Sequence, residues 1–203
     1  MIQISQAVRR IASTRLPTKS GLFQLVGFEH GLPGKIETAL ALTMGDLTQG
    51  APLLRIHSQC FTGEILGSLR CDCRDQLESA METIAAEGCG LVIYEYQEGR
   101  GIGLMAKLQA YALQDGGLDT VEANHALGFN ADCRDFGLPI AILHDLKISR
   151  VRLLSNNPEK QQALVQAGIE VTECISCETT PNTHALSYLR TKKEKMGHTL
   201  TLV

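Results

Sequence analysis

The sequence predicts an α/β protein in which a mixed β-sheet is flanked by helices within one layered domain. Apolar segments of strand length alternate along the chain with segments whose apolar residues recur at helical spacing. The length of 203 residues suits one large domain, and no internal repeat, long linker or low-complexity segment divides the chain. We therefore interpret residues 1–203 as a single domain with a variable lead-in at 1–15 and a polar tail at 182–203.

Composition excludes several classes of protein. A net charge of −3 and a pI near 6.1 argue against binding to nucleic acid through bulk electrostatics. No apolar run approaches the length of a membrane span, so no membrane partner is expected. Seven cysteines, an odd number, without an apolar secretory leader indicate reduced thiols and a cytoplasmic location. An anionic ligand would therefore need a local cluster of Arg and Lys.

The first part of the chain is predicted to be rich in strands. The lead-in shows a short helical patch formed by Val8, Ile11 and Ala12. Strands are predicted at 21–27 and 39–44, with a Gly/Pro turn at 31–34 between them. A further strand at 52–58 leads the chain to Cys60.

Helices and strands alternate after Cys73. Leu77, Met81, Ile84 and Ala85 recur at helical spacing until Gly88 ends the run. Strands are predicted at 91–96, 151–154 and 169–172, and helices at 104–114, 138–146 and 158–167. The last of these helices has Asn157 as its N-cap, Pro158 in its first turn and Gly168 after its end.

Three cysteines lie within fourteen residues, at Cys60, Cys71 and Cys73. Thiolates suit zinc, and three of them leave one tetrahedral position open, as in catalytic zinc sites. The predicted helix begins just after Cys73, and its positive end favours thiolate over thiol. The alternative is that these are three buried and inert side chains.

Two further stretches have the character of a binding site. The glycine-rich turn at 97–103 lies between a strand and a helix and could cradle phosphate, although an ordinary tight turn has the same composition. Polar residues crowd 119–134 without a helical face, which indicates an active-site loop or a solvated connection.

Several motifs, taken together, resemble the GTP cyclohydrolase II family. The resemblance spans residues 16–198 in unbroken order. Its motifs are Arg55-Ile-His-Ser58, Ser68-Leu-Arg-Cys-Asp-Cys73, Gln97-Glu-Gly-Arg100, Tyr111-Ala-Leu-Gln-Asp115, Asp119-Thr-Val-Glu-Ala-Asn-His125, Leu127-Gly-Phe129, Leu154-Ser-Asn-Asn-Pro158 and Lys195-Met-Gly-His198.

The resemblance implies a zinc enzyme of riboflavin biosynthesis. Such an enzyme opens the imidazole ring of GTP, releases C8 as formate and cleaves pyrophosphate. It implies one zinc ion per subunit held by Cys60, Cys71 and Cys73, magnesium with the triphosphate, and a homodimer. The positions that match the family's GTP contacts are Arg55, Ile56, His57, Ser58, Gln59, Gln76, Glu98, Gly99, Arg100, Thr120, Ser155 and Lys160.

The resemblance also implies catalytic residues. Asp132 matches a proton acceptor, and Arg134 matches a proposed nucleophile toward the α-phosphorus. We favour charge stabilisation for Arg134, because a guanidinium is a poor nucleophile. Tyr111 matches a position near the substrate, with a core tyrosine as the alternative. From its chemistry, Glu98 is our candidate for reading the guanine edge, since a carboxylate accepts two N–H bonds.

Departures from the family pattern leave other functions open. Gln59 stands where the family has glutamate, and Cys133 lies between Asp132 and Arg134. A homologue with altered chemistry, which stops at a formylated or monophosphate product, is one alternative. A non-catalytic zinc protein with a regulatory role is the other. Cys174 and Cys177 could form a second, structural zinc site, but no other ligand pair lies near them in the sequence.

Overall fold

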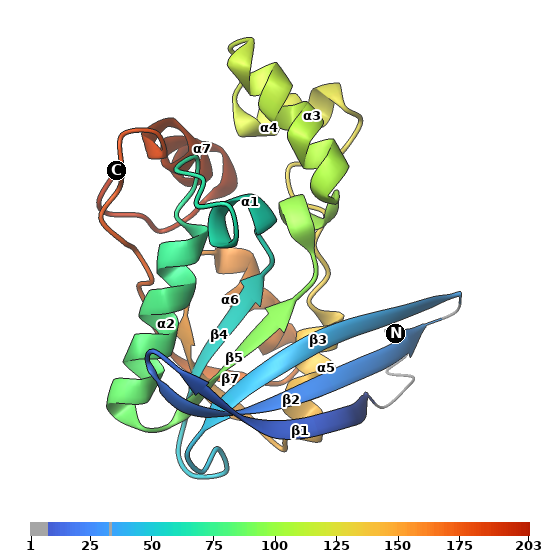
Figure 1. Ribbon diagram of the computed structural model, residues 1–203, viewed down its shortest axis with the longest axis vertical. Helices are drawn as coiled ribbons and strands as arrows, with labels where there is room; N and C mark the ends of the chain where they lie inside the picture. The colour runs from blue at the N-terminus through green and yellow to red at the C-terminus, as the bar shows by residue number, and fades with distance from the viewer. Residues whose placement is uncertain (1–7, 33) are drawn as a thin grey trace.

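The computed structural model describes residues 8–32 and 34–203, and the predicted α/β class is confirmed (Figure 1). The strands are β1 (Arg9–Thr18), β2 (Gly21–Leu32), β3 (Lys35–Met44), β4 (Leu53–Ser58), β5 (Gly90–Glu95), β6 (Arg150–Leu154) and β7 (Glu170–Ile175). The helices are α1 (Phe61–Glu64), α2 (Cys73–Glu87), α3 (Leu104–Asp115), α4 (Thr120–Ala126), α5 (Gly137–Asp145), α6 (Pro158–Gln166) and α7 (Leu186–Met196), with a 3₁₀ turn, η1, at Glu98–Gly101.

The strands form one mixed sheet in the order β1-β2-β3-β5-β4-β6-β7. The first three strands form an antiparallel meander, and β3 also pairs antiparallel with β5. Strands β5, β4, β6 and β7 run parallel to one another. Parallel strands place their carboxyl ends at one edge of the sheet, which is where α/β proteins bind ligands.

Helices cover both faces of this sheet. On one face, Ala80 and Ile84 of α2 pack against Phe23, Leu53 and Val92. The other face is covered by α5 and α6, whose apolar side chains join the larger core. That core contains Leu138, Ile142, Leu143, Leu164, Leu54, Ile56, Leu91 and Ile93. The central strands are therefore buried on both sides, which explains their continuous apolar sequences.

A third group of helices covers no face of the sheet. Figure 1 shows α3, α4 and α7 beyond the carboxyl ends of β4 and β5, with α4 in contact with both α3 and α7. Together with α1, they enclose the space into which the parallel strands point. Within residues 8–32 and 34–203, no helix has the length and apolar character needed to cross a membrane.

Most of the predicted elements are confirmed, and several extend beyond the predicted bounds. Gly88 ends α2 with a φ of 76°, and the Asn157 side chain accepts a hydrogen bond from the Glu159 N–H at the start of α6. Gly168 follows α6 with a φ of 80°. Of the predicted turn at 31–34, Gly31 and Leu32 belong to β2 and Gly34 lies between β2 and β3, while Pro33 is outside the described residues.

One prediction is wrong and two are incomplete. Of the predicted helical patch, Ile11 and Ala12 belong to β1, and Val8 precedes that strand. The side chains of β1 are mostly exposed and so show no apolar alternation. The stretch at 119–134 begins with α4, because Asp119 and Glu122 form a capping box. The polar tail at 182–203 contains α7, which buries Leu189, Thr191 and Lys192. Residues 1–7 of the predicted lead-in lie outside the described residues, so this part of the prediction is not tested.

Candidate active site

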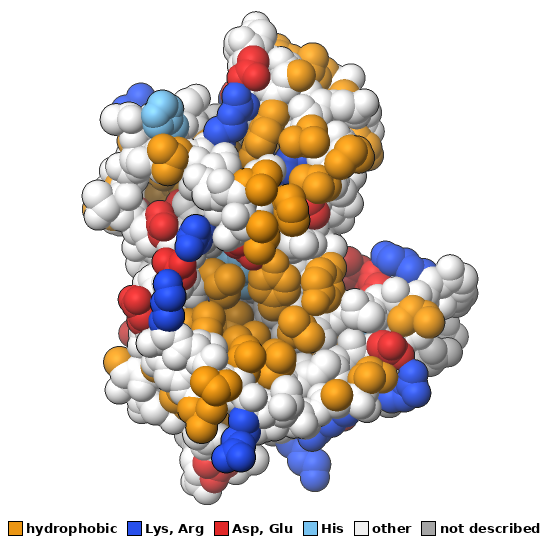
Figure 2. All heavy atoms as spheres, in the orientation of Figure 1, with side chains coloured by type: hydrophobic (Ala, Val, Ile, Leu, Met, Phe, Trp, Pro, Cys, Tyr) orange, Lys and Arg blue, Asp and Glu red, His pale blue; other side chains and the backbone are white. Residues whose placement is uncertain are grey.

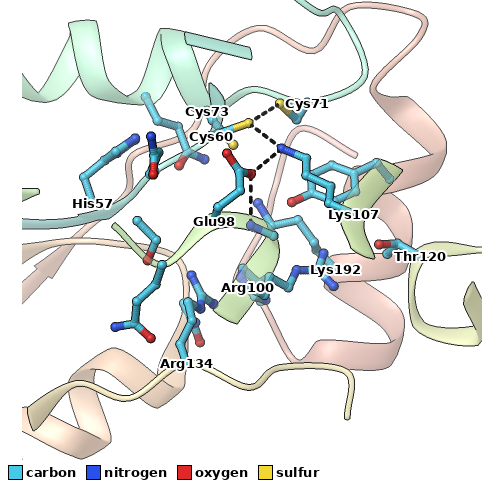
Figure 3. A pocket seen from close by; sticks show the side chains of 18 of the residues that line it. His57, Cys60, Cys71, Cys73, Glu98, Arg100, Lys107, Thr120, Arg134 and Lys192 are labelled. Carbon is cyan, nitrogen blue, oxygen red and sulfur yellow. Dashed lines mark hydrogen bonds and ion pairs between the residues drawn. The ribbon is translucent and has the colours of Figure 1, made fainter. Parts of the chain in front are cut away.

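A cavity lies at the carboxyl ends of β4, β5 and β6, beneath α3, α4 and α7 (Figure 3). Of the described residues, seven Lys and Arg side chains line it, against one carboxylate side chain, Glu98. The seven cationic residues are Arg55, Arg70, Arg100, Lys107, Arg134, Lys160 and Lys192. Such an excess of positive charge attracts and concentrates anions. The local cation cluster that the sequence required for an anionic ligand is therefore present.

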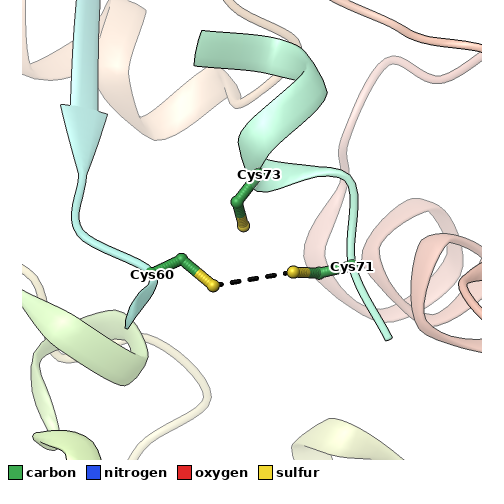
Figure 4. Close-up of side chains that lie close together, drawn as sticks. All are labelled: Cys60, Cys71 and Cys73. Carbon is green, nitrogen blue, oxygen red and sulfur yellow. Dashed lines mark hydrogen bonds between the residues drawn. The ribbon is translucent and has the colours of Figure 1, made fainter. Parts of the chain in front are cut away.

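Cys60, Cys71 and Cys73 converge at one wall of the cavity (Figure 4). Their sulfur atoms all lie within 4.8 Å of one another, and Cys60 Sγ is 3.6 Å from Cys71 Sγ. Cys60 follows β4, whereas Cys73 begins α2 with Asp72 as its N-cap. The strand and the helix thus bring the thiols together, and the cluster could hold a metal ion.

The thiols of this cluster are linked to one another through hydrogen bonds. Hydrogen bonds from Cys71 and Cys73 lower the pKa of Cys60 far below its ordinary value. The hydrogen bond to Cys60 raises the pKa of Cys71 to about 11. The ammonium of Lys107 lies 3.1 Å from Cys60 Sγ and balances the thiolate.

Glu64 holds the segment that carries Cys60. Its Oε1 accepts the Cys60 N–H at 2.7 Å and lies 3.1 Å from His57 Nε2, while its Oε2 accepts the Tyr94 hydroxyl at 2.6 Å. Burial lowers the pKa of His57 to about 4, so its imidazole is neutral. The Arg55 guanidinium lies 3.5 Å from His57 Nδ1. His57 thus has a partner at each ring nitrogen and connects Glu64 to Arg55.

Glu98 is engaged on both carboxylate oxygens. Oε2 accepts the Phe61 N–H at 2.6 Å, and Oε1 accepts the Gly99 N–H at 2.9 Å and the Lys107 ammonium at 2.7 Å. Lys107 therefore links Glu98 to Cys60 (Figure 3). A carboxylate oxygen has two lone pairs, so one on Oε2 remains free. Bidentate binding of a guanine edge requires a free lone pair on each carboxylate oxygen, and Glu98 has only the one on Oε2.

The turn after β5 holds a strained backbone. Gly99 and Arg100 have φ values of 62° and 60°, and for Arg100 this left-handed conformation is unfavourable. A Cβ on Gly101, where φ is 90°, would lie 2.7 Å from the Cys133 carbonyl oxygen. The Cys133 N–H in turn donates to the Arg100 carbonyl at 3.0 Å. The turn and the loop that carries Arg134 are therefore packed directly together.

Two buried cations extend from the parallel strands and α6. Arg55 donates to the Leu154 carbonyl at 3.0 Å and to Gln76 Oε1 at 2.6 Å. Lys160 donates to the Ile56 carbonyl at 2.8 Å, and burial together with the nearby Arg55 lowers its pKa. Burial also raises the pKa of Glu95 to about 7. These cations lack a full complement of anions, so the site favours a negatively charged ligand.

Asp132 and Arg134 form a forked ion pair. Arg134 Nε donates to both carboxylate oxygens, at 2.9 and 3.1 Å, and Arg134 NH2 also contacts Oδ2. Burial raises the pKa of Asp132, but Arg134 outweighs this effect and the net pKa is lowered. Asp132 therefore carries a negative charge and Arg134 a positive one.

The structure brings together nearly all of the predicted site residues. Ile56 and Asp132 do not line the main cavity: the side chain of Ile56 is in the core, and Asp132 lines a second hollow beside Phe136 and Glu159. Arg134 lines both hollows. The predicted residues that line the main cavity are Arg55, His57, Ser58, Gln59, Cys60, Cys71, Cys73, Gln76, Glu98, Gly99, Arg100, Tyr111, Thr120, Arg134, Ser155 and Lys160.

Tyr111 and Gln59 both face the cavity. The Tyr111 hydroxyl lies 3.3 Å from Thr62 Oγ1, and the Arg70 guanidinium stacks on its ring at 4.7 Å. The Gln59 N–H donates to the Glu95 carbonyl at 2.8 Å, which leaves its side chain beside Cys60 at the cavity wall. The alternative of a core tyrosine is therefore wrong for Tyr111.

Sequence reasoning missed several polar residues of the site. Glu64 could have been found from its position four residues after Cys60 in the short helix α1. Lys107 precedes Tyr111 by four residues on α3, a spacing that places both on one helix face. Tyr188 and Lys192 lie in α7, which was taken for a polar tail. Cys174 is exposed on β7 and Cys177 is buried against the Gln76 carbonyl. Neither belongs to a metal-ligating group of the described residues.

Gly63 makes room for the thiol cluster, which gives a testable prediction. A Cβ at this position would lie 3.0 Å from Cys71 Sγ and 3.2 Å from Cys60 Sγ. We expect Gly63→Ala to weaken metal binding by about 10- to 100-fold, the range typical of changes next to metal ligands. Competition with a chromogenic chelator measures this affinity, and Gly27→Ala is the control because its Cβ would meet open space and its backbone does not have a positive φ. Equal affinity in wild type and Gly63→Ala would contradict the prediction.

The fold and the cavity define a class of protein. Cationic side chains, a thiol cluster and strained backbone meet at the carboxyl ends of parallel strands, as in α/β enzymes that act on small anionic molecules. The family model described as GTP cyclohydrolase II matches residues 9–176. The chain belongs to the GTP cyclohydrolase II family of enzymes.

Individual relatives agree with this assignment. A protein named GTP cyclohydrolase-2 from Hahella chejuensis is 50% identical over 96% of this chain and 94% of its own length. A GTP cyclohydrolase-2 from Azotobacter vinelandii is 51% identical over 94% of this chain and 91% of its own. The riboflavin biosynthesis protein RibBA of Cytophaga hutchinsonii is 50% identical over 95% of this chain, which covers 47% of that longer protein.

Proposed function

We propose that the protein hydrolyses GTP at two places, as the opening reaction of riboflavin biosynthesis. The imidazole ring is opened with loss of C8 as formate, and pyrophosphate is released. The product is 2,5-diamino-6-(ribosylamino)pyrimidin-4-one 5'-phosphate. The observation that carries this proposal is the shared cavity: one wall has the thiol cluster, and the others have the seven cationic side chains that suit a triphosphate.

We assign one zinc ion per chain to Cys60, Cys71 and Cys73. At a Zn–S distance of 2.3 Å, a tetrahedral site separates its sulfurs by roughly 3.8 Å, and the Cys60–Cys71 separation is 3.6 Å. Gly63 leaves the room that a side chain would fill, and the cluster faces the cavity, so a zinc ion held there would be accessible to a ligand from the cavity. When bound, zinc would supply Lewis-acid chemistry by lowering the pKa of bound water.

The chain's own residues bind and orient the nucleotide. Arg55, Arg100 and Lys160 supply positive charge for the phosphates, and Lys160 also lies in the first turn of α6, where backbone N–H groups favour anions. We expect magnesium to accompany the triphosphate, as is usual for nucleotide phosphates. Arg134, fixed by Asp132, stabilises negative charge at the reacting phosphorus. Glu98 positions Lys107 and the backbone of Phe61, with its remaining lone pair available to the base.

Proton uptake is expected when the nucleotide binds. Burial lowers the pKa of Lys160 well below its ordinary value and raises the pKa of Glu95 to about 7, so Glu95 is partly deprotonated near neutral pH. A phosphate anion nearby raises both pKa values. Binding of a non-hydrolysable GTP analogue at pH 7 should therefore take up as much as about one proton per site.

This uptake is measured by calorimetry in buffers of different ionisation enthalpy. Lys160→Met should reduce both the uptake and the affinity, whereas Lys147→Met, at a lysine that does not line the cavity, should change neither. Binding without uptake, or with proton release, would contradict the prediction.

Product analysis tests the proposed function itself. The purified protein, loaded with zinc, is incubated with GTP and magnesium, and formate and pyrophosphate are assayed separately. Release of both supports the proposal. Release of pyrophosphate alone supports a homologue with altered chemistry, an alternative suggested by the glutamine at position 59. If neither product is released, the result supports a non-catalytic protein.

A homodimer is part of the proposal. Large apolar side chains are exposed after α1 and along α3, and Figure 2 shows apolar side chains gathered over the region of α3. Exposed apolar groups of this kind are typical of surfaces that bind another protein. The exposed residues are Ile65, Leu66, Leu69, Met105 and Leu108. Sedimentation analysis distinguishes a dimer from a monomer.

A further inference from the structure

The C-terminal part of the chain forms one wall of the cavity. Tyr188, Lys192, His198 and Leu200 line it, although the family-model match ends at residue 176. Tyr188 and Lys192 lie one turn apart on α7, which contacts α4. This wall faces the turn that carries Arg100 (Figure 3). This wall borders the candidate phosphate site, but none of its residues has yet been given a role in binding the ligand.

Two cations meet at a single ring on this wall. The Arg100 guanidinium lies 5.3 Å from the Tyr188 ring centroid, and the Lys192 ammonium lies 5.0 Å from it. An aromatic ring attracts each cation. It does not neutralise them, so two like charges remain close together in a partly dehydrated site. Such an arrangement is favourable when an anion binds between the two cations.

Lys192 makes no hydrogen bond to the carboxylate with which it pairs, that of Asp72. Lys192 is 8% exposed, and its Nζ lies 3.6 Å from Asp72 Oδ1, longer than a hydrogen bond. Among the described residues, Asp72 Oδ1 and Arg100 NH2 are both buried without a hydrogen-bond partner. Three further carboxylates near the cavity are already engaged: Glu98 binds Lys107, Asp132 binds Arg134, and Glu95 accepts hydrogen bonds from Ser58 and Gln97. Arg100 and Lys192 thus retain donor capacity at the cavity.

We propose that Lys192, held beside Arg100 by the Tyr188 ring, binds phosphate oxygens of the nucleoside triphosphate, so that α7 completes the phosphate site. This inference rests on the proposed function, because GTP is the ligand. Lys192 contacts the substrate directly, and Tyr188 is a positioning residue. The N–H donors of Arg100 and Lys192 converge on one phosphate group, and α7 becomes more ordered when that group is bound.

Inorganic tripolyphosphate, GTP and guanosine are the probes. Titration calorimetry compares wild type, Lys192→Met and the control Lys193→Met, which removes the neighbouring exposed lysine. We expect Lys192→Met to weaken tripolyphosphate and GTP binding by about 10- to 100-fold and to leave guanosine binding unchanged. Lys192→Arg should recover most of the affinity. Tyr188→Phe, which keeps the ring, should bind like wild type, whereas Tyr188→Leu should be weakened.

Two further measurements separate this role from a structural one. Zinc content should be the same in wild type and Lys192→Met if Lys192 binds phosphate. If Lys192 served only to hold Asp72 in place, its loss would disturb the neighbouring Cys71 and Cys73 and lower the zinc content. In wild type, hydrogen exchange of the α7 amides should slow when tripolyphosphate is added, a result that does not depend on the folding of any variant.

The outcomes distinguish this inference from the proposed function. Equal tripolyphosphate affinity in Lys192→Met and Lys193→Met, or unchanged exchange in α7, overturns the role of Lys192. Loss of zinc together with affinity in Lys192→Met also overturns it, in favour of a structural role. Failure of the wild-type protein to release formate or pyrophosphate from GTP overturns the proposed function, whatever the variants bind.

Discussion

Replacement of Cys71 by serine is expected to abolish formate release. The sulfur of Cys71 lies 3.6 Å from that of Cys60 and is one of three proposed zinc ligands. A serine hydroxyl is a poor zinc ligand at neutral pH, because metals bind the deprotonated group and thiols ionise far more readily. Loss of the metal removes several kcal/mol of Lewis-acid stabilisation, which corresponds to a decrease of roughly 10³-fold or more.

Nucleotide binding should survive this change in part. The cationic residues that are proposed to hold the triphosphate, such as Arg55 and Lys160, lie on β4 and α6 and not on the cysteine-bearing segment. We therefore expect Cys71→Ser to bind GTP within about tenfold of wild type. Formate is measured by a coupled dehydrogenase assay, zinc by atomic absorption and GTP binding by calorimetry.

Cys174→Ser is the matched control, because Cys174 is an exposed thiol on β7. It should retain zinc, formate release and GTP affinity. Normal formate release by Cys71→Ser without bound metal would overturn the zinc assignment. Loss of zinc from Cys174→Ser as well would place the metal at a different set of thiols.

The parts of the site that the sequence predicted are those fixed by local chemistry. Cys71 and Cys73 could be assigned to the start of a helix because the apolar spacing after them and Gly88 define α2 directly. Asn157 and Pro158 likewise defined the start of α6 and so the position of Lys160. In each case, the interactions that form the element lie within a few residues of one another.

The contacts that sequence reasoning missed join distant parts of the chain. Lys107 lies 47 residues from Cys60, and its role depends on how α3 packs over the end of β4. Lys192 is buried only because α7 packs against α4 and faces the cavity, and in the sequence it is one of several lysines in a basic stretch. Strand β1 was missed for another reason. Its side chains are mostly solvated, so the pairing of its backbone with β2 leaves no apolar pattern.

Substitution of Arg134 by lysine is expected to lower pyrophosphate release by roughly 10²- to 10³-fold, the range for loss of one group that stabilises transition-state charge. Lysine keeps the charge but lacks the fork by which Arg134 Nε donates to both oxygens of Asp132. Asp132→Asn removes the same fork from the other side. If the pair acts as a unit, the double variant should be hardly slower than either single variant. Arg150→Lys is the control, since Arg150 pairs with Glu170 on the exposed surface.

The ion pair between Asp132 and Arg134 also argues against a nucleophilic role for Arg134. Burial lowers the pKa of Arg134, but Asp132 outweighs this effect, and the net shift raises the pKa above its already high ordinary value. A nucleophilic nitrogen needs a free lone pair, which a permanently protonated and delocalised guanidinium does not offer. Rapid quenching of the wild-type reaction should therefore yield no nucleotidyl adduct on Arg134 by mass spectrometry. Detection of that adduct at a rate matching turnover would show that the ion pair breaks during the reaction, and Asp132 would then have to accept the guanidinium proton.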